Sequence, residues 1–148
     1  MRQILFAMAA ALAPGAALAC QITHVPTPES AAAADYVVAG RVIDYLPEAW
    51  DSFARAPRYA LLRMEVSEVW KGEVGDVFEL VLTDDTMPLP RNWDWPQEII
   101  IVAMDPKNPG KAPRDSLPQA GFSICAMPLA VLTDESRAAF RDYFSAAE

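Results

Sequence analysis

Cysteine and histidine are scarce in this chain of 148 residues, which has two cysteines and one histidine. It contains no Cys-x-x-Cys, His-x-His or Met-x-x-Met spacing, so the common metal-binding motifs are missing. His24 has no Ser or Cys nucleophile motif beside it, as nucleophilic catalysis would require. We therefore expect no enzymatic activity, no cofactor and no metal site in the isolated chain, and we expect His24 to be a solvated loop residue.

Positive charge is scarce as well, because 12 Lys and Arg residues stand against 20 Asp and Glu residues. The formal net charge is −8 at pH 7 with His neutral, and the chain has no basic cluster. Nucleic-acid binding and electrostatic docking on anionic lipid both need such a cluster. The composition therefore argues against both kinds of partner.

Long apolar runs are missing too, and none of those present is long enough to span a membrane. The first one, residues 4–16, comes after Met1-Arg2-Gln3 and is followed by Ala17-Leu18-Ala19-Cys20. One positive charge, a short apolar core and small residues at positions 17 and 19 are typical of a secretory signal peptide. We predict a signal over residues 1–19 and a single mature domain over residues 20–148, located in the periplasm or outside the cell.

Cleavage after Ala19 would make Cys20 the first mature residue, and three interpretations of it stay open. In an oxidising compartment the first is a disulfide with Cys125, which would stabilise the fold by roughly 4–5 kcal/mol. The second is a lipid anchor, which the small residue at Ala17 disfavours and which would leave Cys125 unpaired. The third coexists with the disulfide: the free α-amine and the carbonyl of Cys20 form a bidentate chelate that could fill the open position of a catalytic zinc.

Five segments have the pattern of β-strands, and helices flank them at both ends. The expected strands are residues 36–43, 58–70, 77–83, 98–104 and 121–126, with Gly40 marking a bulge or a sharp coil. Thr27 and Thr133 have the position of N-caps, for a short helix over residues 28–34 and a terminal helix up to residue 146. Five short strands in so small a chain indicate a closed or partly closed barrel.

Two tryptophans, Trp93 and Trp95, lie in an irregular loop rich in proline and aspartate. Exposed aromatic side chains at a barrel mouth would form a partner surface, and the alternative is that the two rings cap one end of the barrel. The acids nearby, Asp84, Asp85 and Asp94, are most simply solvated loop residues.

Three segments together resemble the netrin-like module, the fold of the N-terminal domain of tissue inhibitors of metalloproteinases. They are ADYVVAGRV at 34–42, MEVSEVWKGEVGD at 64–76 and SICAMPL at 123–129. The resemblance spans most of the mature chain in the family's order, and it is to secreted bacterial-type members more than to the animal inhibitors. It implies a five-stranded OB-type barrel with flanking helices. It also implies that Cys20 matches the N-terminal cysteine with which the animal inhibitors chelate the catalytic zinc.

The sequence as a whole predicts a secreted, non-catalytic module that binds a protein partner, with an extracytoplasmic metalloprotease as one candidate. The expected partner-binding residues are Cys20, Gln21, Ile22, Trp93 and Trp95. Two other hypotheses stay open: a structural or envelope-associated domain, and a periplasmic protein that carries a small ligand or a metal.

Overall fold

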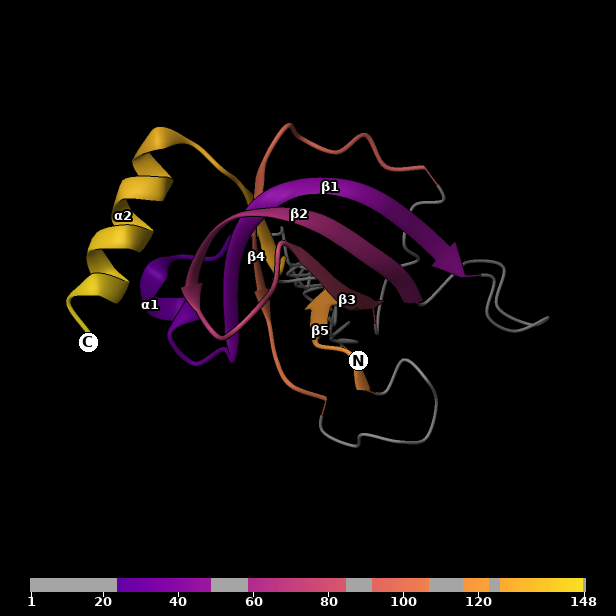
Figure 1. Ribbon diagram of the computed structural model, residues 1–148, viewed down its shortest axis with the longest axis horizontal. Coiled ribbons are helices and arrows are strands. Elements are labelled where there is room, and N and C mark those ends of the chain that lie inside the picture. Colours follow the sequence, from indigo (N-terminus) through magenta and orange to yellow (C-terminus); the bar gives the residue numbers. More distant parts are fainter. Residues whose placement is uncertain (1–23, 49–58, 85–91, 107–115, 123–125, 148) are drawn as a thin grey trace, which may run out of the picture.

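The computed structural model describes residues 24–48, 59–84, 92–106, 116–122 and 126–147 of the chain. Over these residues the protein is mainly β, with a six-stranded mixed sheet that curls into a half-barrel and two helices beside it (Figure 1). The strands are β1 Tyr36–Glu48, β2 Tyr59–Lys71, β3 Val77–Asp84, β4 Ile99–Ala103, β5 Gln119–Phe122 and β6 Leu129–Val131. The helices are α1 Pro28–Ala31 and α2 Asp134–Ser145.

The sheet has the strand order β5-β3-β2-β1-β4-β6. All neighbouring strands are antiparallel except β3 and β5, which run parallel. Just beyond β4, Met104 and Gln119 exchange two backbone hydrogen bonds of 2.9 and 2.8 Å. The curled sheet therefore brings the end of the β4 segment back to β5, at the far side of the strand order.

The prediction of five strands is wrong, because the described residues contain six. A single last strand was expected over residues 121–126, but β5 ends at Phe122 and β6 begins at Leu129. The two pieces have different partners, since β5 pairs with β3 and β6 pairs with β4. The alternation of side chains shows that a segment is extended but not which strand it pairs with. The sequence pattern alone therefore did not reveal the break.

β1 and β2 form a long antiparallel pair whose register shifts at three places. One shift lies between Ala39 and Gly40, as the glycine predicted, and there Ser67 of β2 has no residue opposite it. One unpaired residue reverses the alternation of side chains along a strand. Before it, Met64 faces the concave side of the sheet, whereas after it Glu68 and Trp70 face α2.

The core has two parts, one on each side of the curled sheet. Inside the curl lie alternating residues of the strands, and the predicted inward set of β2 and β3 is confirmed: Leu62, Met64, Phe78, Leu80 and Leu82 are buried and Val66 is half-buried. The second part lies between the sheet and the helices and contains Ala31, Ala34, Val37, Ile100 and Phe140. Because β1 and β4 contribute to both parts, the strong apolar run of β4 is buried on both faces.

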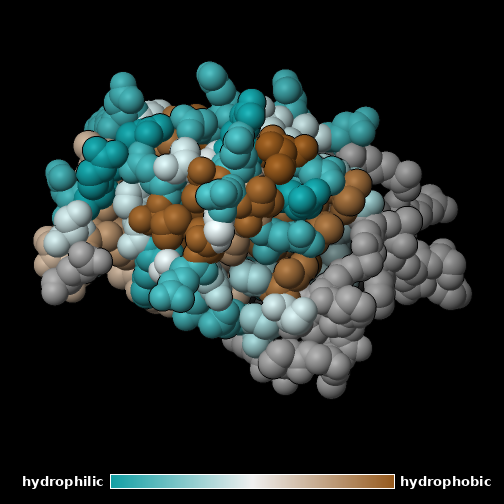
Figure 2. Space-filling model, viewed as in Figure 1, coloured by the Kyte–Doolittle hydropathy of each residue, from teal (hydrophilic) through white to brown (hydrophobic). Residues whose placement is uncertain are grey.

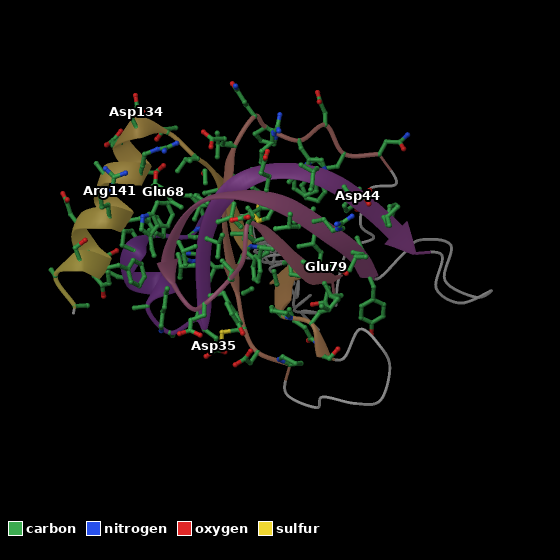
Figure 3. All side chains as sticks on the ribbon, viewed as in Figure 1. Asp35, Asp44, Glu68, Glu79, Asp134 and Arg141 are labelled. Atoms are coloured by element: carbon green, nitrogen blue, oxygen red, sulfur yellow. The ribbon has the colours of Figure 1, made fainter. Side chains whose placement is uncertain are left out.

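Both helices begin where the sequence predicted. Thr27 and Thr133 are their N-caps, and each forms a capping box with the serine three residues later. Ion pairs hold α2 to the sheet, because Arg137 and Arg141 both contact Glu68 of β2, at 2.5 and 3.0 Å. Figure 3 shows Arg141 of α2 beside Glu68. Arg137 also contacts Glu98, at 3.1 Å, so α2 is fixed to the sheet along its first two turns and at Arg141.

Candidate binding surfaces

The chain that follows the predicted mature N-terminus lies against the last part of the sheet. His24 forms a parallel bridge with Ala126, and the Met127 amide donates a hydrogen bond of 3.1 Å to the His24 carbonyl oxygen. The His24 side chain is exposed, as expected. The predicted residues Cys20, Gln21, Ile22 and Cys125 lie outside the described residues, so their pairing and partner contacts stay predictions.

The pairing of the N-terminal segment does not continue past the His24 bridge towards α1, for a local reason. Pro26 has no N–H group with which it could continue the pairing, and Thr27 already caps α1. Val25 is left with 54% of its surface exposed beside the bridge. The N-terminal segment is therefore held at His24 and again at α1.

Trp93 and Trp95 stack on each other, with ring centroids 4.5 Å apart. Both rings meet Tyr45 of β1 edge to face, at 6.2 and 5.4 Å, which the sequence did not indicate. All three side chains are half-buried and pack against the core inside the curl. Burial raises the pKa of Tyr45 to about 12, because a phenolate loses more solvation than a phenol does. The three rings therefore extend the core inside the curl, and both interpretations of the tryptophans, a cap of the barrel and a partner surface, stay predictions.

The N-terminal segment and the two tryptophans lie at opposite ends of β4. Ile99 pairs with Gly40, and the loop that carries Trp93 and Trp95 comes directly before Ile99. At the other end of β4, the amide of Val102 bonds to Pro128, two residues after the Ala126 bridge. The His24 bridge and the loop with Trp93 and Trp95 are thus separated by the length of β4, five residues or roughly 17 Å of an antiparallel strand.

The outer face of β1, β2 and β3 carries a mixture of apolar and charged side chains. Figure 2 shows brown apolar groups interleaved with teal polar groups over this face. Ile43 and Leu46 are 47% and 50% exposed, and Arg41 pairs with Glu65 across the strands at 2.6 Å. Exposed ion pairs of this kind are typical of a solvated sheet face.

A cleft of about 490 Å³ lies between α1, β2 and α2. It is lined by residues 69–72 at the end of β2, by Ala32 after α1, and by Tyr143 and Phe144 of α2. Lys71 is half-buried there and donates a hydrogen bond of 2.7 Å to the Ala32 carbonyl oxygen. In the sequence, the aromatic stripe of α2 and the Trp-Lys-Gly end of β2 are separate features. Nothing in the chain pattern placed them together, because they are more than 70 residues apart.

The acidic residues, within the described part of the chain, show no clustering that would hold a metal ion. No group of three or more His, Cys, Asp or Glu residues among them has the necessary arrangement. Asp35 and Asp105 come closest to a functional pair: the Asp105 amide donates to Asp35, and the Tyr36 hydroxyl donates to Asp105, both at 2.8 Å. The hydrogen bond to Asp105, with burial and the two negative charges, raises the pKa of Tyr36.

Comparison with known protein families and with curated proteins found no match for this chain. In the described residues, no helix is both long enough and apolar enough to cross a membrane.

Proposed function

We propose that this chain is a secreted, non-catalytic protein-binding module of netrin-like, OB-type fold, which presents its mature N-terminus to a partner. The observation that carries the proposal is the bridge between His24 and Ala126, which docks the N-terminal segment on the sheet. A docked segment binds with a smaller entropy loss than a free one, so rigid presentation favours affinity.

The strand connections support the OB-type part of the proposal. β5 and β6 are separated only by residues 123–128, and they flank opposite sides of the curled sheet. Taken as two halves of one fifth strand, they give a five-stranded, partly open barrel closed at the Met104–Gln119 bridge. Of the three segments that resemble the netrin-like module, the first (34–42) falls mostly on β1 and the second (64–76) on the end of β2 and the turn after it. The third (123–129) joins β5 to β6 and ends on the first residue of β6.

The reach of the chain supports the disulfide and the position of the amine. Cys20 is four residues before His24, so its Cα lies within about 14 Å of that anchored residue. Cys125 comes directly before Ala126, the residue that His24 pairs with. The Cα separation of about 4.4–6.8 Å that a disulfide requires is therefore within reach. The bond would hold the Cys20 α-amine beside the end of the sheet.

A zinc metalloprotease is the partner class that this geometry fits. The α-amine and carbonyl of Cys20 form a bidentate chelate, and a catalytic zinc keeps one position open for water or substrate. The proposed inhibitor would fill that position without undergoing any reaction itself.

The test is a one-residue extension of the N-terminus. The partner is first captured from the native extracytoplasmic fraction on immobilised mature protein, identified by mass spectrometry and purified. Its affinity is then measured for the mature protein, for a variant with one alanine before Cys20, and for a control with one alanine after Glu148. Intact mass establishes which N-terminus each sample has.

The extension replaces the amine with an amide and moves it, so we expect affinity to fall at least about a hundredfold, roughly 2.7 kcal/mol. The C-terminal control should bind like the unmodified protein. Equal affinity of all three forms would overturn the N-terminal mode and leave a binding module that uses another surface.

A further inference from the structure

We propose that the cleft between α1, β2 and α2 binds a small carboxylate with an aromatic or branched apolar body. This site is separate from the proposed N-terminal binding mode and does not depend on it. Its volume of about 490 Å³ lies within the range of small-molecule sites, about 300–1,000 Å³.

Three aromatic side chains, Trp70, Tyr143 and Phe144, line the cleft together with polar groups and small apolar residues. Trp70 packs on Phe140 at a centroid distance of 5.0 Å, and Tyr143 meets Phe144 edge to face at 5.3 Å. The ion pairs of Glu68 hold α2 against the same part of β2. A preformed site of this kind avoids the entropy loss of ordering its side chains, and its rings accept a flat apolar body.

Lys71 supplies the charge that selects an anion. Among the described residues it forms no ion pair with a carboxylate, whereas four arginines of the strands and α2 each have at least one: Arg41, Arg63, Arg137 and Arg141. An ammonium group has three N–H donors, and the Ala32 carbonyl uses one of them. A half-buried cation with unused donors favours an anionic acceptor beside it.

The other polar side chains that line the cleft are also donors. Tyr143 contributes a hydroxyl, and the indole N–H of Trp70 is buried without a hydrogen-bond partner in the described structure. Glu73 and Asp142 are next in sequence to the lining residues Gly72 and Tyr143, and the whole chain is acidic. This negative surrounding disfavours a multiply charged anion such as phosphate. A monoanion with an apolar body fits both the Lys71 ammonium and the aromatic walls.

The experiment titrates the ¹⁵N-labelled mature protein with phenylacetate, with the neutral analogue phenylacetamide and with inorganic phosphate. The amide of Gly72 reports on the cleft, and the amides of the loop with Trp93 and Trp95 report on a distant surface. We expect phenylacetate to shift the Gly72 amide and to bind at least about tenfold more tightly than phenylacetamide, about 1.4 kcal/mol. Phosphate should leave the cleft amides unchanged.

Variants assign the preference to Lys71. Lys71→Gln should make the acid and the amide bind equally, and Lys71→Arg should keep the preference and serve as the test if the glutamine variant does not fold. Arg63→Gln is the matched control, because it removes one positive charge from the same strand at an exposed side chain that does not line the cleft. This control should keep the acid preference of the wild type. The proposal is overturned if the wild type shows no binding at the cleft, equal affinity for acid and amide, or an acid preference that survives Lys71→Gln.

Discussion

Gly40 of β1 lies directly against the backbone of β2, and replacing it with alanine should be strongly destabilising. A Cβ atom at this position would overlap the carbonyl oxygen of Glu65 and would lie 3.1 Å from the Met64 Cε atom. The oxygen belongs to the backbone of β2, so no change of side-chain rotamer can make room. The two strands would have to move apart at the point where the register shifts.

The magnitude follows from two contributions. Overpacking a tight site costs about 1–3 kcal/mol. Separating the strands would also weaken one or two ladder hydrogen bonds, at about 1 kcal/mol each. We therefore expect Gly40→Ala to lower the free energy of unfolding by about 2–5 kcal/mol, a large part of the roughly 5–15 kcal/mol typical of a domain.

The assay is urea unfolding of the mature protein, followed by far-UV circular dichroism. Gly75→Ala is the matched control, because a Cβ there would meet nothing within 4 Å. The control should be neutral or stabilising by up to about 1 kcal/mol, through a less flexible unfolded chain. If Gly40→Ala stays within about 0.5 kcal/mol of the wild type, the close approach of β1 and β2 at this glycine is refuted.

Three further predictions concern α2, Tyr45 and the cysteines. Glu68→Gln should lower the free energy of unfolding by about 1–2 kcal/mol, because Glu68 is 17% exposed and pairs with two arginines. Glu65→Gln should lower it by less than about 0.5 kcal/mol, because the side chains of the Arg41–Glu65 pair are 57–61% exposed. Urea unfolding of both variants measures the difference. The raised pKa of Tyr45, about 12, means that its contribution to stability is complete below about pH 10 and is lost as the pH rises from about 10 towards 12. Spectrophotometric titration should therefore show a late tyrosine that Tyr45→Phe removes, and an unchanged titration would contradict the burial of this ring. Cys125→Ser should cost about 2–5 kcal/mol if Cys20 and Cys125 are paired, and two reactive thiols in the unreduced protein would exclude the bond.

Features that depend on neighbours in sequence could be predicted. Thr133 caps α2 because its hydroxyl accepts a hydrogen bond from the Ser136 amide, and the Ser136 hydroxyl accepts one from the Thr133 amide. The spacing of these two residues is visible in the sequence. The alternation of β3 placed Phe78, Leu80 and Leu82 on the buried side because the period of a strand is two. Gly40 indicated a bulge because glycine inside a strand has few other uses.

Features that depend on which strands become neighbours could not be predicted. The expected last strand is divided into β5 and β6 because its first part pairs with β3 and its second part pairs with β4. No local sequence pattern indicates such a change of pairing partner. The contact of Tyr45 with Trp95 joins residues 50 positions apart through the curl of β1. The position of Trp70 also departs from simple alternation, because the unpaired Ser67 turns it from the inside of the sheet towards α2.

The cleft is therefore a product of register more than of composition. Lys71 pairs with Val37 of β1, Val37 pairs with Val102 of β4, and the Val102 amide bonds to Pro128 beside the docked N-terminal segment. This row crosses the sheet from β2 to the segment before β6, and a slip of one residue of β2 against Val37 would move Lys71 to the opposite face. The register of β1 and β2 shifts next to Gly40. Gly40 therefore helps to set the position of Lys71 in the cleft. A folded Gly40→Ala protein should therefore lose the carboxylate preference of the cleft along with its stability, whereas Gly75→Ala should keep both.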